Sequence, residues 1–291
     1  MVVLLVTLAL AMHTDPEGNE PPADAPVAAE PEQPLVETAP EEPVAPPTSE
    51  TVVRSNKPRS AASASTVRDR DLMLRPHPRP ADILQTVPGF YVVQHAGGGK
   101  ANQYFLRGFD ADHGTDVLLS VDGVPVNMVS HGHGQGYADL NWVIPELVKR
   151  VDVKKGPYFA DVGDFATAGA MDLVTVPHVD GSSVSVSTGG FLLDDPTAFM
   201  AKPLATSRVL VMVAPDVNGA HPFFAGEVYA TDGPFESPEK LQRFSLFARA
   251  PLDFGDSGRM TLTATSYGSG WNASGQLPNR AVKRGERAHE V

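Results

Sequence analysis

Residues 117–127 read VLLSVDGVPVN, and residues 144–157 read IPELVKRVDVKKGP. In the first stretch, alternate residues from Val117 to Val121 share one face, which is the period of a β-strand. In the second, Pro145 stands where a helix begins, and two alternating valines follow in RVDVKKGP. The two stretches therefore predict one strand, and then a short helix that leads into another strand.

The neighbouring segments extend this pattern over residues 66–176. RPADILQTVPGF predicts a short helix that starts near Pro80 and stops at Pro88-Gly89. FYVVQH and NQYFLRGF are strand candidates on either side of the turn AGGGK, and AMDLVTV is a last strand before Val176. The pattern predicts a compact mixed α/β unit.

Residues 177–291 have a different character. Short alternating runs such as SSVSVST, RVLVMV, RFSLFARA and RMTLTATSY are separated by Gly, Pro, Asp and Asn turns. In RMTLTATSY, the side chains of Met260, Leu262 and Ala264 point one way and the threonines point the other. A transmembrane β-barrel and a soluble sandwich both produce this alternation, so the pattern by itself leaves both open.

Charge and composition exclude some classes of function. The net charge is −12, but the first 53 residues hold ten carboxylates and no Lys or Arg, so the rest of the chain is nearly balanced. A balanced body without a basic block is not typical of a nucleic-acid-binding protein, and we expect no nucleic-acid partner. Cysteine is absent, which excludes disulfides, thiolate metal clusters and a cysteine nucleophile.

The first 65 residues do not have the composition of a folded domain. Residues 1–11 form a short apolar run that ends in the A-x-A pattern of a signal peptide, with a disordered apolar tail as the alternative. Residues 12–65 are rich in Pro, Glu and Ala, and we expect a disordered acidic tail. Within it, Glu50, Thr51, Val52 and Val53 form a lone β-prone stretch that continues to Arg54. Such a stretch suits addition to another protein's sheet edge, or it is a chance cluster.

Three ligand-binding motifs fail on inspection. AGGGKA has Gln94 where a P-loop needs its first glycine, GHGQG lacks the dinucleotide-binding spacing, and DADHGTD misplaces the glycine of a calcium loop. The stretch MVSHGHGQGYADL, residues 128–140, carries His131 and His133, which suit a transition metal or are polar contacts of a solvated loop. Two imidazoles are too few for a tight metal site, so we predict no resident metal. We also predict no cofactor and no catalytic residue.

Read in order, DILQTVPGF, LRGF, VDGVPV, IPELVKRVDV and KGP resemble the landmarks of the plug domain of TonB-dependent outer-membrane receptors. The resemblance covers roughly residues 66–176, and residues 177–291 are similar to the first strands of that family's barrel. It implies a mixed α/β plug domain followed by an incomplete antiparallel transmembrane β-barrel segment, after a disordered Pro/Glu-rich N-terminal tail. The landmark residues are Arg107, Gly108, Asp122, Gly123, Gly156 and Pro157.

The resemblance also implies a function. Residues 50–53 become a TonB box, which pairs with the energy-transducing TonB protein in the periplasm. The chain is then a receptor of the outer membrane of a Gram-negative cell for an iron or cobalamin complex, haem, a free metal or a glycan. It would not be an enzyme. Because the family's barrel has 22 strands and about five are expected here, we expect the chain to be a fragment.

Topology places the ligand-contacting residues. If FYVVQH runs outward, AGGGK is the outer turn, DADHGTD is the inner turn, VLLSVDG runs outward, and residues 128–140 lie at the outer apex beside residues 94–103. His113 then falls at the opposite end. The predicted ligand contacts are His95, Gln103, His131, His133, Gln135 and Tyr137. Two alternatives remain: a stand-alone periplasmic or secreted binding module, and a metal-dependent hydrolase that uses the two histidines of residues 131–133.

Overall fold

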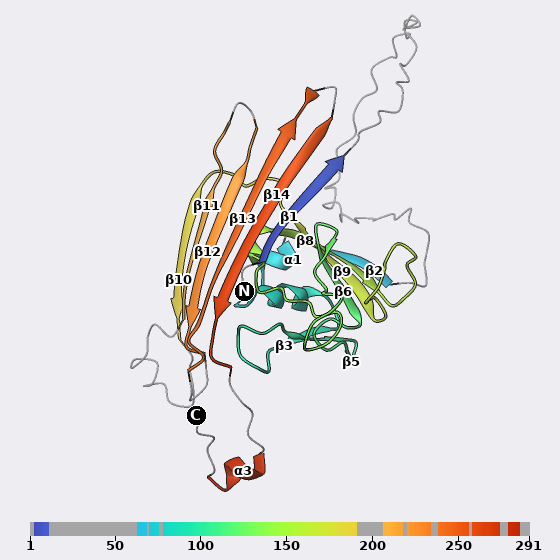
Figure 1. The fold of residues 1–291 in the computed structure, drawn as a ribbon, viewed down its shortest axis with the longest axis vertical. Helices are drawn as coiled ribbons and strands as arrows, with labels where there is room; N and C mark the ends of the chain where they lie inside the picture. Colours follow the sequence, from blue (N-terminus) through green and yellow to red (C-terminus); the bar gives the residue numbers. More distant parts are fainter. Residues whose placement is uncertain are drawn as a thin grey trace, which may run out of the picture. The chain divides into compact units, whose positions relative to one another are not determined.

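The computed structural model describes residues 3–11, 63–68, 70–75, 78–190, 206–217, 220–233, 238–255, 258–273 and 279–285 (Figure 1). The TonB-box candidate, residues 50–53, and the acidic tail before it lie outside these residues, and both stay predictions. All described elements belong to one compact unit, which comprises residues 1–12 and 61–291.

A mixed five-stranded sheet forms the centre of the first part of the chain. Its order is β2 (Ser63–Arg68), β8 (Val148–Lys155), β9 (Gly169–Thr175), β6 (Val117–Val121) and β7 (Val124–Pro125). Strand β6 runs parallel to β9 and the other pairs are antiparallel. The alternating valines of RVDVKKGP lie on one buried face, as the sequence predicts.

A smaller sheet joins β3 (Phe90–Val93), β4 (Gln103–Leu106) and β5 (Phe109–Asp110). Between β4 and β5 the chain reverses over only two residues, Arg107 and Gly108, with φ of 53° and 81°. Two consecutive positive φ values are typical of a type I′ hairpin turn, which glycine adopts without a steric penalty.

Helical structure in the described residues is scarce. The helix predicted near Pro80 is the 3₁₀ helix η1 (Pro80–Thr86), and η2 (Pro145–Leu147) is followed at once by β8. The prediction that IPELVKR is helical is therefore wrong after Leu147, because the alternating valines that follow favour a strand. The short α-helices are α1 (Arg70–Met73) and α3 (Asn279–Lys283). No helix among the described residues is long and apolar enough to cross a membrane.

A six-stranded antiparallel sheet follows, in the order β1-β14-β13-β12-β11-β10 (Figure 1). Its later strands are β10 (Ser183–Gly189), β11 (Thr206–Val213), β12 (Phe223–Thr231), β13 (Leu241–Asp253) and β14 (Arg259–Gly270). These are the five strands that the alternating runs predict. Strand β1 (Val3–Ala11) pairs with β14 along its whole length. That pairing does not test whether residues 1–11 are a signal peptide, which stays a prediction.

Strand β13 alternates strictly between two faces. Arg243, Ser245 and Arg249 are buried on the face toward the first part of the chain, whereas Phe244 and Leu246 are exposed on the opposite face. The buried face also carries the apolar Leu241 and Phe247, so it is mixed, whereas the opposite face is largely apolar. An apolar outer face opposite a buried face with several charged residues is typical of a barrel wall. The described strands form an open sheet, which is the incomplete barrel segment that the resemblance implies.

The six-stranded sheet is called here the wall. The wall and the plug-like part touch at both ends of the wall strands. We call the end of these strands with Glu239 and Trp271 the loop end, and the end with residues 214–217, 220–222 and 254–255 the turn end. At the turn end, Arg249 donates to the Asp122 carboxylate and to the carbonyl of Val176, both at 2.6 Å. At the loop end, the Gly98 N–H donates to Glu239 at 2.9 Å.

Candidate functional site

Two loops of the plug-like part meet at the loop end. Residues 94–103 connect β3 to β4, and residues 128–137 form a hairpin closed by a bridge between Met128 and Tyr137. The Ala101 N–H donates to the Tyr137 hydroxyl at 2.9 Å, and the Asn141 side chain donates to the carbonyl of Lys100 at 3.2 Å. The loops therefore form one joined surface.

The buried side chain of Asn127 holds the base of the hairpin. Its oxygen accepts the Leu119 N–H at 2.7 Å, and its amide nitrogen lies 2.8 to 3.0 Å from the carbonyls of Gly114, Val117 and Gly136. The backbone at Gly114 and Gly136 is so close that a Cβ on the first would lie 2.5 Å from the carbonyl oxygen of the second. Only glycine fits this approach.

Four histidines and one tyrosine gather on this surface. The ring of His131 stacks on Tyr137 with 3.9 Å between centroids, and the ring of His133 meets His113 edge-on at 4.5 Å. His95 stacks on His113 at 5.1 Å. Together with the carboxylate of Asp112, these side chains are called here the histidine cluster: His95, Asp112, His113, His131, His133 and Tyr137.

The carboxylate of Asp112 lies between two imidazoles. Its two oxygens lie 3.6 Å from Nε2 of His113 and 3.6 Å from Nε2 of His133, respectively. His113 is buried, and its Nδ1 lies 2.9 Å from the carbonyl oxygen of Asn102, so Nδ1 carries the proton and donates. Burial lowers the pKa of His113, while the Asn102 bond and Asp112 oppose that shift. The other ring nitrogen, Nε2, faces the Asp112 carboxylate.

Comparison with known proteins accounts for this fold. Residues 56–170 match the family model described as the TonB-dependent Receptor Plug Domain. The chain carries a TonB-dependent receptor plug domain. The family is named for receptors, which agrees with the prediction that the chain is not an enzyme.

Solved receptor structures share the fold of the plug domain together with the wall strands. The copper transporter OprC matches with a TM-score of 0.52 at 17% identity, covering 73% of this chain and 31% of that chain. The ferric enterobactin receptor PfeA and the pyoverdine receptor FpvA, both from Pseudomonas aeruginosa, each match with a TM-score of 0.50 at 17% identity. These two matches cover 72% and 73% of this chain, and 34% and 29% of those chains. The chain thus spans about a third of the length of these receptors.

The plug domain brings four of the six predicted contact residues together. His95, His131, His133 and Tyr137 all belong to the histidine cluster. Gln103 instead donates to the Asp110 carboxylate at 3.1 Å. Gln135 is exposed, and its backbone carbonyl accepts a bond from Thr115.

The placement of His113 at the opposite end is wrong. The chain reverses at Arg107-Gly108, so Ala111 and Asp112 run back along Tyr104 through two backbone hydrogen bonds of 2.9 and 2.7 Å. Residues 110–116 therefore lie at the loop end. Strand β6 then runs away from the loop end, and a second two-residue turn, Asp122-Gly123, sends the chain back.

Asp112 is the cluster residue that the sequence reasoning missed. DADHGTD attracts notice as a calcium loop and fails that test, and its Asp-His pair then has no other motif to belong to. The signal that was available is the dipeptide Arg107-Gly108 between two strand candidates. A two-residue turn there aligns Asp112 with residues 102–104 by antiparallel register.

The remaining landmark residues serve the plug domain's turns. Asp122 and Gly123 have φ of 50° and 78°, and Gly156, which precedes Pro157, has φ of 84°. The Asp122 carboxylate accepts hydrogen bonds from the N–H and the hydroxyl of Thr175, at 2.8 and 2.6 Å, in addition to its bond with Arg249. These residues position strands and do not face the histidine cluster.

Burial also perturbs acid–base groups behind the cluster. It raises the pKa of the Asp139 carboxyl to about 6, against the opposing hydrogen bond from the Asn141 N–H and the charge of Arg243. Burial likewise raises the pKa of the Tyr137 hydroxyl. The Asp139 carboxyl behind the cluster is therefore partly protonated, and so carries less negative charge, at mildly acidic pH.

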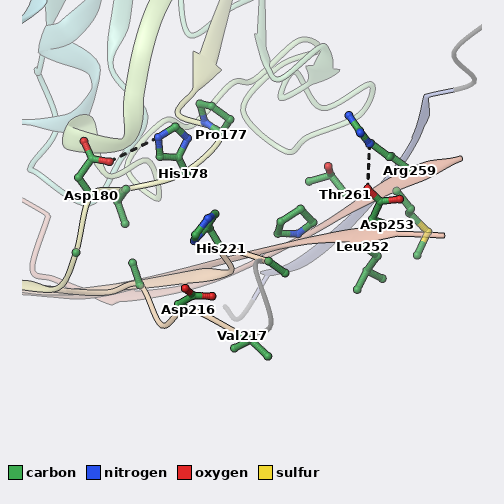
Figure 2. A pocket seen from close by; sticks show the side chains of 16 residues that line it. Pro177, His178, Asp180, Asp216, Val217, His221, Leu252, Asp253, Arg259 and Thr261 are labelled. Atoms are coloured by element: carbon green, nitrogen blue, oxygen red, sulfur yellow. Dashed lines mark hydrogen bonds and ion pairs between the residues drawn. The ribbon is translucent and has the colours of Figure 1, made fainter. Parts of the chain in front are cut away.

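A hollow of the described residues lies at the turn end, away from the histidine cluster (Figure 2). Its volume is about 1050 Å³, and it lies between the exit segment of the plug domain and the ends of β13 and β14. Figure 2 shows His178 paired with Asp180 at 3.6 Å, and Arg259 paired with Asp253 at 3.2 Å. The hollow is partly open, and its lining mixes apolar and charged side chains.

Proposed function

We propose that this chain forms the plug and the first wall strands of an outer-membrane receptor that takes up a scarce nutrient with energy from TonB. The observation that carries the proposal is a plug domain packed against a strand face that carries both buried charges and an apolar cluster, while the other face of the strands is apolar. On the face toward the plug, Glu227 is buried between Arg208 and Arg243, with nitrogen–oxygen distances of 2.5 and 3.1 Å. Buried charges of this kind suit a wall face that meets a plug and not lipid.

The outer face of the wall supports a membrane location. Its exposed side chains are largely apolar; the large ones include Val184, Val186, Val209, Val211, Phe224, Val228, Phe244 and Leu246. A continuous apolar face of this kind suits lipid, whereas water disfavours it. This face argues against a stand-alone soluble binding module.

The loop end is the proposed face toward the outside of the cell. Cβ atoms built on Gly132 and Gly134 meet nothing within 4 Å, so the tip of the hairpin borders open space. His95, Gln103, His131, His133, Gln135 and Tyr137 are the proposed ligand contacts. The ligand proposed at this stage is a metal chelate or another large nutrient.

The turn end then faces the periplasm, together with the N-terminal tail and the TonB box at residues 50–53. Residues 1–11 are the proposed signal peptide, residues 12–65 the tail, residues 66–176 the plug domain and residues 177–291 the wall. Ligand binding at the loop end is proposed to shift the plug's conformational population and to release the TonB box. TonB then adds to the box by strand pairing.

Cysteine cross-linking tests this proposal, because the chain has no cysteine of its own. Val52→Cys places a single thiol in the TonB box, and Val27→Cys is a matched change in the acidic tail. In outer-membrane preparations, we expect Val52→Cys to form disulfides with cysteines introduced along the periplasmic domain of TonB. Adding Val53→Pro removes a backbone donor and abolishes the cross-link.

Equal yields for Val52→Cys and Val27→Cys would overturn the assignment of the TonB box. Recovery of the full chain in the soluble periplasmic fraction would overturn the membrane location and favour the binding module. Neither readout depends on the identity of the ligand.

A further inference from the structure

Three ligand-type side chains of the histidine cluster face one another across a small gap. The donor atoms of Asp112, His113 and His133 all lie within 4.8 Å of one another. They come from two separate segments of the plug domain, so the antiparallel return of residues 109–113 and the hairpin of residues 128–137 build the group together.

The distances suit a bridging ion better than direct bonds. At 3.6 Å, neither imidazole Nε2 is within hydrogen-bond distance of the Asp112 oxygen that it faces. Tetrahedral ligands about 2.0–2.1 Å from zinc lie roughly 3.3 Å apart. The two imidazole–carboxylate distances exceed this by a few tenths of an ångström, and the three donor atoms lie within 4.8 Å of one another. Movements on the order of 1 Å would therefore bring the two imidazoles and the carboxylate to a common ion.

His113 is preorganised as a ligand. Its ring is buried, and its Nδ1–H donates to the carbonyl of Asn102, which is the second contact that metal-binding histidines usually make. Its Nε2 is buried and has no hydrogen-bond partner among the described residues. A buried acceptor without a partner is costly, and an ion in the gap would satisfy it.

His131 positions the site and is not one of its ligands. Its Nδ1 accepts the backbone N–H of His133 at 3.2 Å, while its ring stacks on Tyr137. These two contacts fix the hairpin backbone from which the His133 side chain reaches Asp112. The site stays open to solution, because about half of the Asp112 side chain is exposed.

We propose that Asp112, His113 and His133 bind a divalent late transition metal ion directly, without an organic chelator. Two imidazoles with one carboxylate suit zinc, copper or nickel, whereas calcium and magnesium prefer oxygen ligands alone. The three protein ligands leave a coordination position for water or for a donor from solution. The site itself stands on geometry, and only its role as the cargo site rests on the proposed function.

Zinc titration of the full chain tests the site. The chain is purified in detergent micelles without a histidine tag, stripped with a chelator, and titrated with zinc chloride by calorimetry. We expect saturable binding of one ion per chain, and no binding of calcium or magnesium. X-ray absorption at the zinc edge is expected to show two imidazoles and oxygen donors.

Variants separate this site from adventitious surface binding. Asp112→Asn and His133→Ala are each expected to raise the Kd for zinc at least ~10-fold, the scale on which even outer-shell changes act. Asparagine tolerates the left-handed backbone of Asp112, whose φ is 45°, so that variant removes charge without adding backbone strain. His178→Ala, an exposed histidine at the turn end, is the matched control and is expected to leave the Kd unchanged.

His133→Cys replaces one donor by another and is expected to restore part of the affinity. Circular dichroism on every variant separates a lost ligand from a lost fold. Zinc binding that survives both Asp112→Asn and His133→Ala, or that His178→Ala weakens equally, would overturn the proposal, as would no saturable binding at all.

The outcome is independent of the TonB experiment. Zinc binding without a Val52→Cys cross-link would keep the metal site and reject the proposed transport. A cross-link without zinc binding would keep the receptor and reject direct metal recognition.

Discussion

Two aspartates of the plug domain have similar left-handed backbones but opposite surroundings. Asp122, with φ of 50°, lies at the turn end, and its carboxylate accepts bonds of 2.6 to 2.8 Å from Arg249 and Thr175. Asp112, with φ of 45°, lies at the loop end, and the imidazoles that face its carboxylate are 3.6 Å away. The first carboxylate is used to hold the plug against the wall. The second faces two imidazoles without a direct hydrogen bond to either, and these three side chains form the proposed metal site.

The largest expected effect tests this contrast with one substitution at both positions. Asp122→Asn leaves the nearly buried Arg249 without its counter-charge, and we expect a loss of about 2–3 kcal/mol in the free energy of unfolding. Asp112→Asn, without metal, is expected to change it by less than about 0.5 kcal/mol. Denaturant unfolding in detergent, followed by the fluorescence of Trp142 and Trp271, measures both. Similar losses at the two positions would remove the contrast.

The next effect concerns the pH dependence of stability that comes from the Asp139 carboxyl behind the histidine cluster. Because the pKa of Asp139 is raised to about 6 from 3.8, the folded state holds its proton where the unfolded state has released it. Between about pH 4 and pH 6 stability therefore falls as pH rises, by on the order of 2 kcal/mol from this group. Unfolding at pH 4 and pH 7 measures the difference.

Asp139→Asn is the control for the pH experiment. Its amide cannot ionise, so this part of the pH dependence is expected to vanish in the variant. If the free energy of unfolding of the variant still falls as steeply between pH 4 and pH 6, other groups cause this pH dependence.

A smaller effect separates the structural glycine of the hairpin from its two open glycines. Gly136 has φ of +79°, and a Cβ there would lie 2.8 Å from the Phe165 ring and 2.9 Å from the Cα of Thr115. Gly136→Ala is therefore expected to cost about 1–2 kcal/mol, from strain and from contact. Gly132→Ala and Gly134→Ala meet nothing and are expected to be nearly neutral. The same unfolding assay compares the three, and equal costs would contradict the assignment.

The sequence could predict the elements of the plug domain but not its path. Alternation and turn residues locate β3, β4, β6 and β8, because strand period and turn chemistry are local properties. The direction of β6 was missed, because two-residue reversals at Arg107-Gly108 and Asp122-Gly123 are short and each inverts all that follows. Each of the two missed reversals inverts the chain direction, so together they leave residues 128–140 at the loop end, as predicted. His113 lies between the two reversals and is therefore at the loop end instead of the predicted opposite end.

The sequence of the wall strands also could not decide between a barrel and a sandwich. The alternation of β13 fits both folds, and only the part of the molecule that packs on its buried face distinguishes them. That part is the plug domain, whose Asp122 carboxylate and Val176 carbonyl accept hydrogen bonds from Arg249. The three glycines of AGGGK likewise have their explanation in the wall, because a Cβ on Gly99 would lie 2.1 Å from the indole of Trp271.

The smallest expected effect asks whether the two loops of the loop end act as one surface. The Tyr137 hydroxyl accepts the Ala101 N–H and is the direct link between residues 94–103 and the hairpin, so Tyr137→Phe leaves that donor without its acceptor. We expect a loss of about 1 kcal/mol in the free energy of unfolding, since the stacked ring is retained. Tyr158→Phe, at an exposed ring outside the cluster, is the matched control and is expected to be neutral.

If the link matters for the site, Tyr137→Phe also weakens zinc binding by a few-fold, because His131 and His133 are carried on the hairpin that the hydroxyl holds in place. Loss of stability with an unchanged Kd for zinc would mean that the hairpin alone defines the metal geometry, and that the glycine-rich loop serves only the contact with the wall.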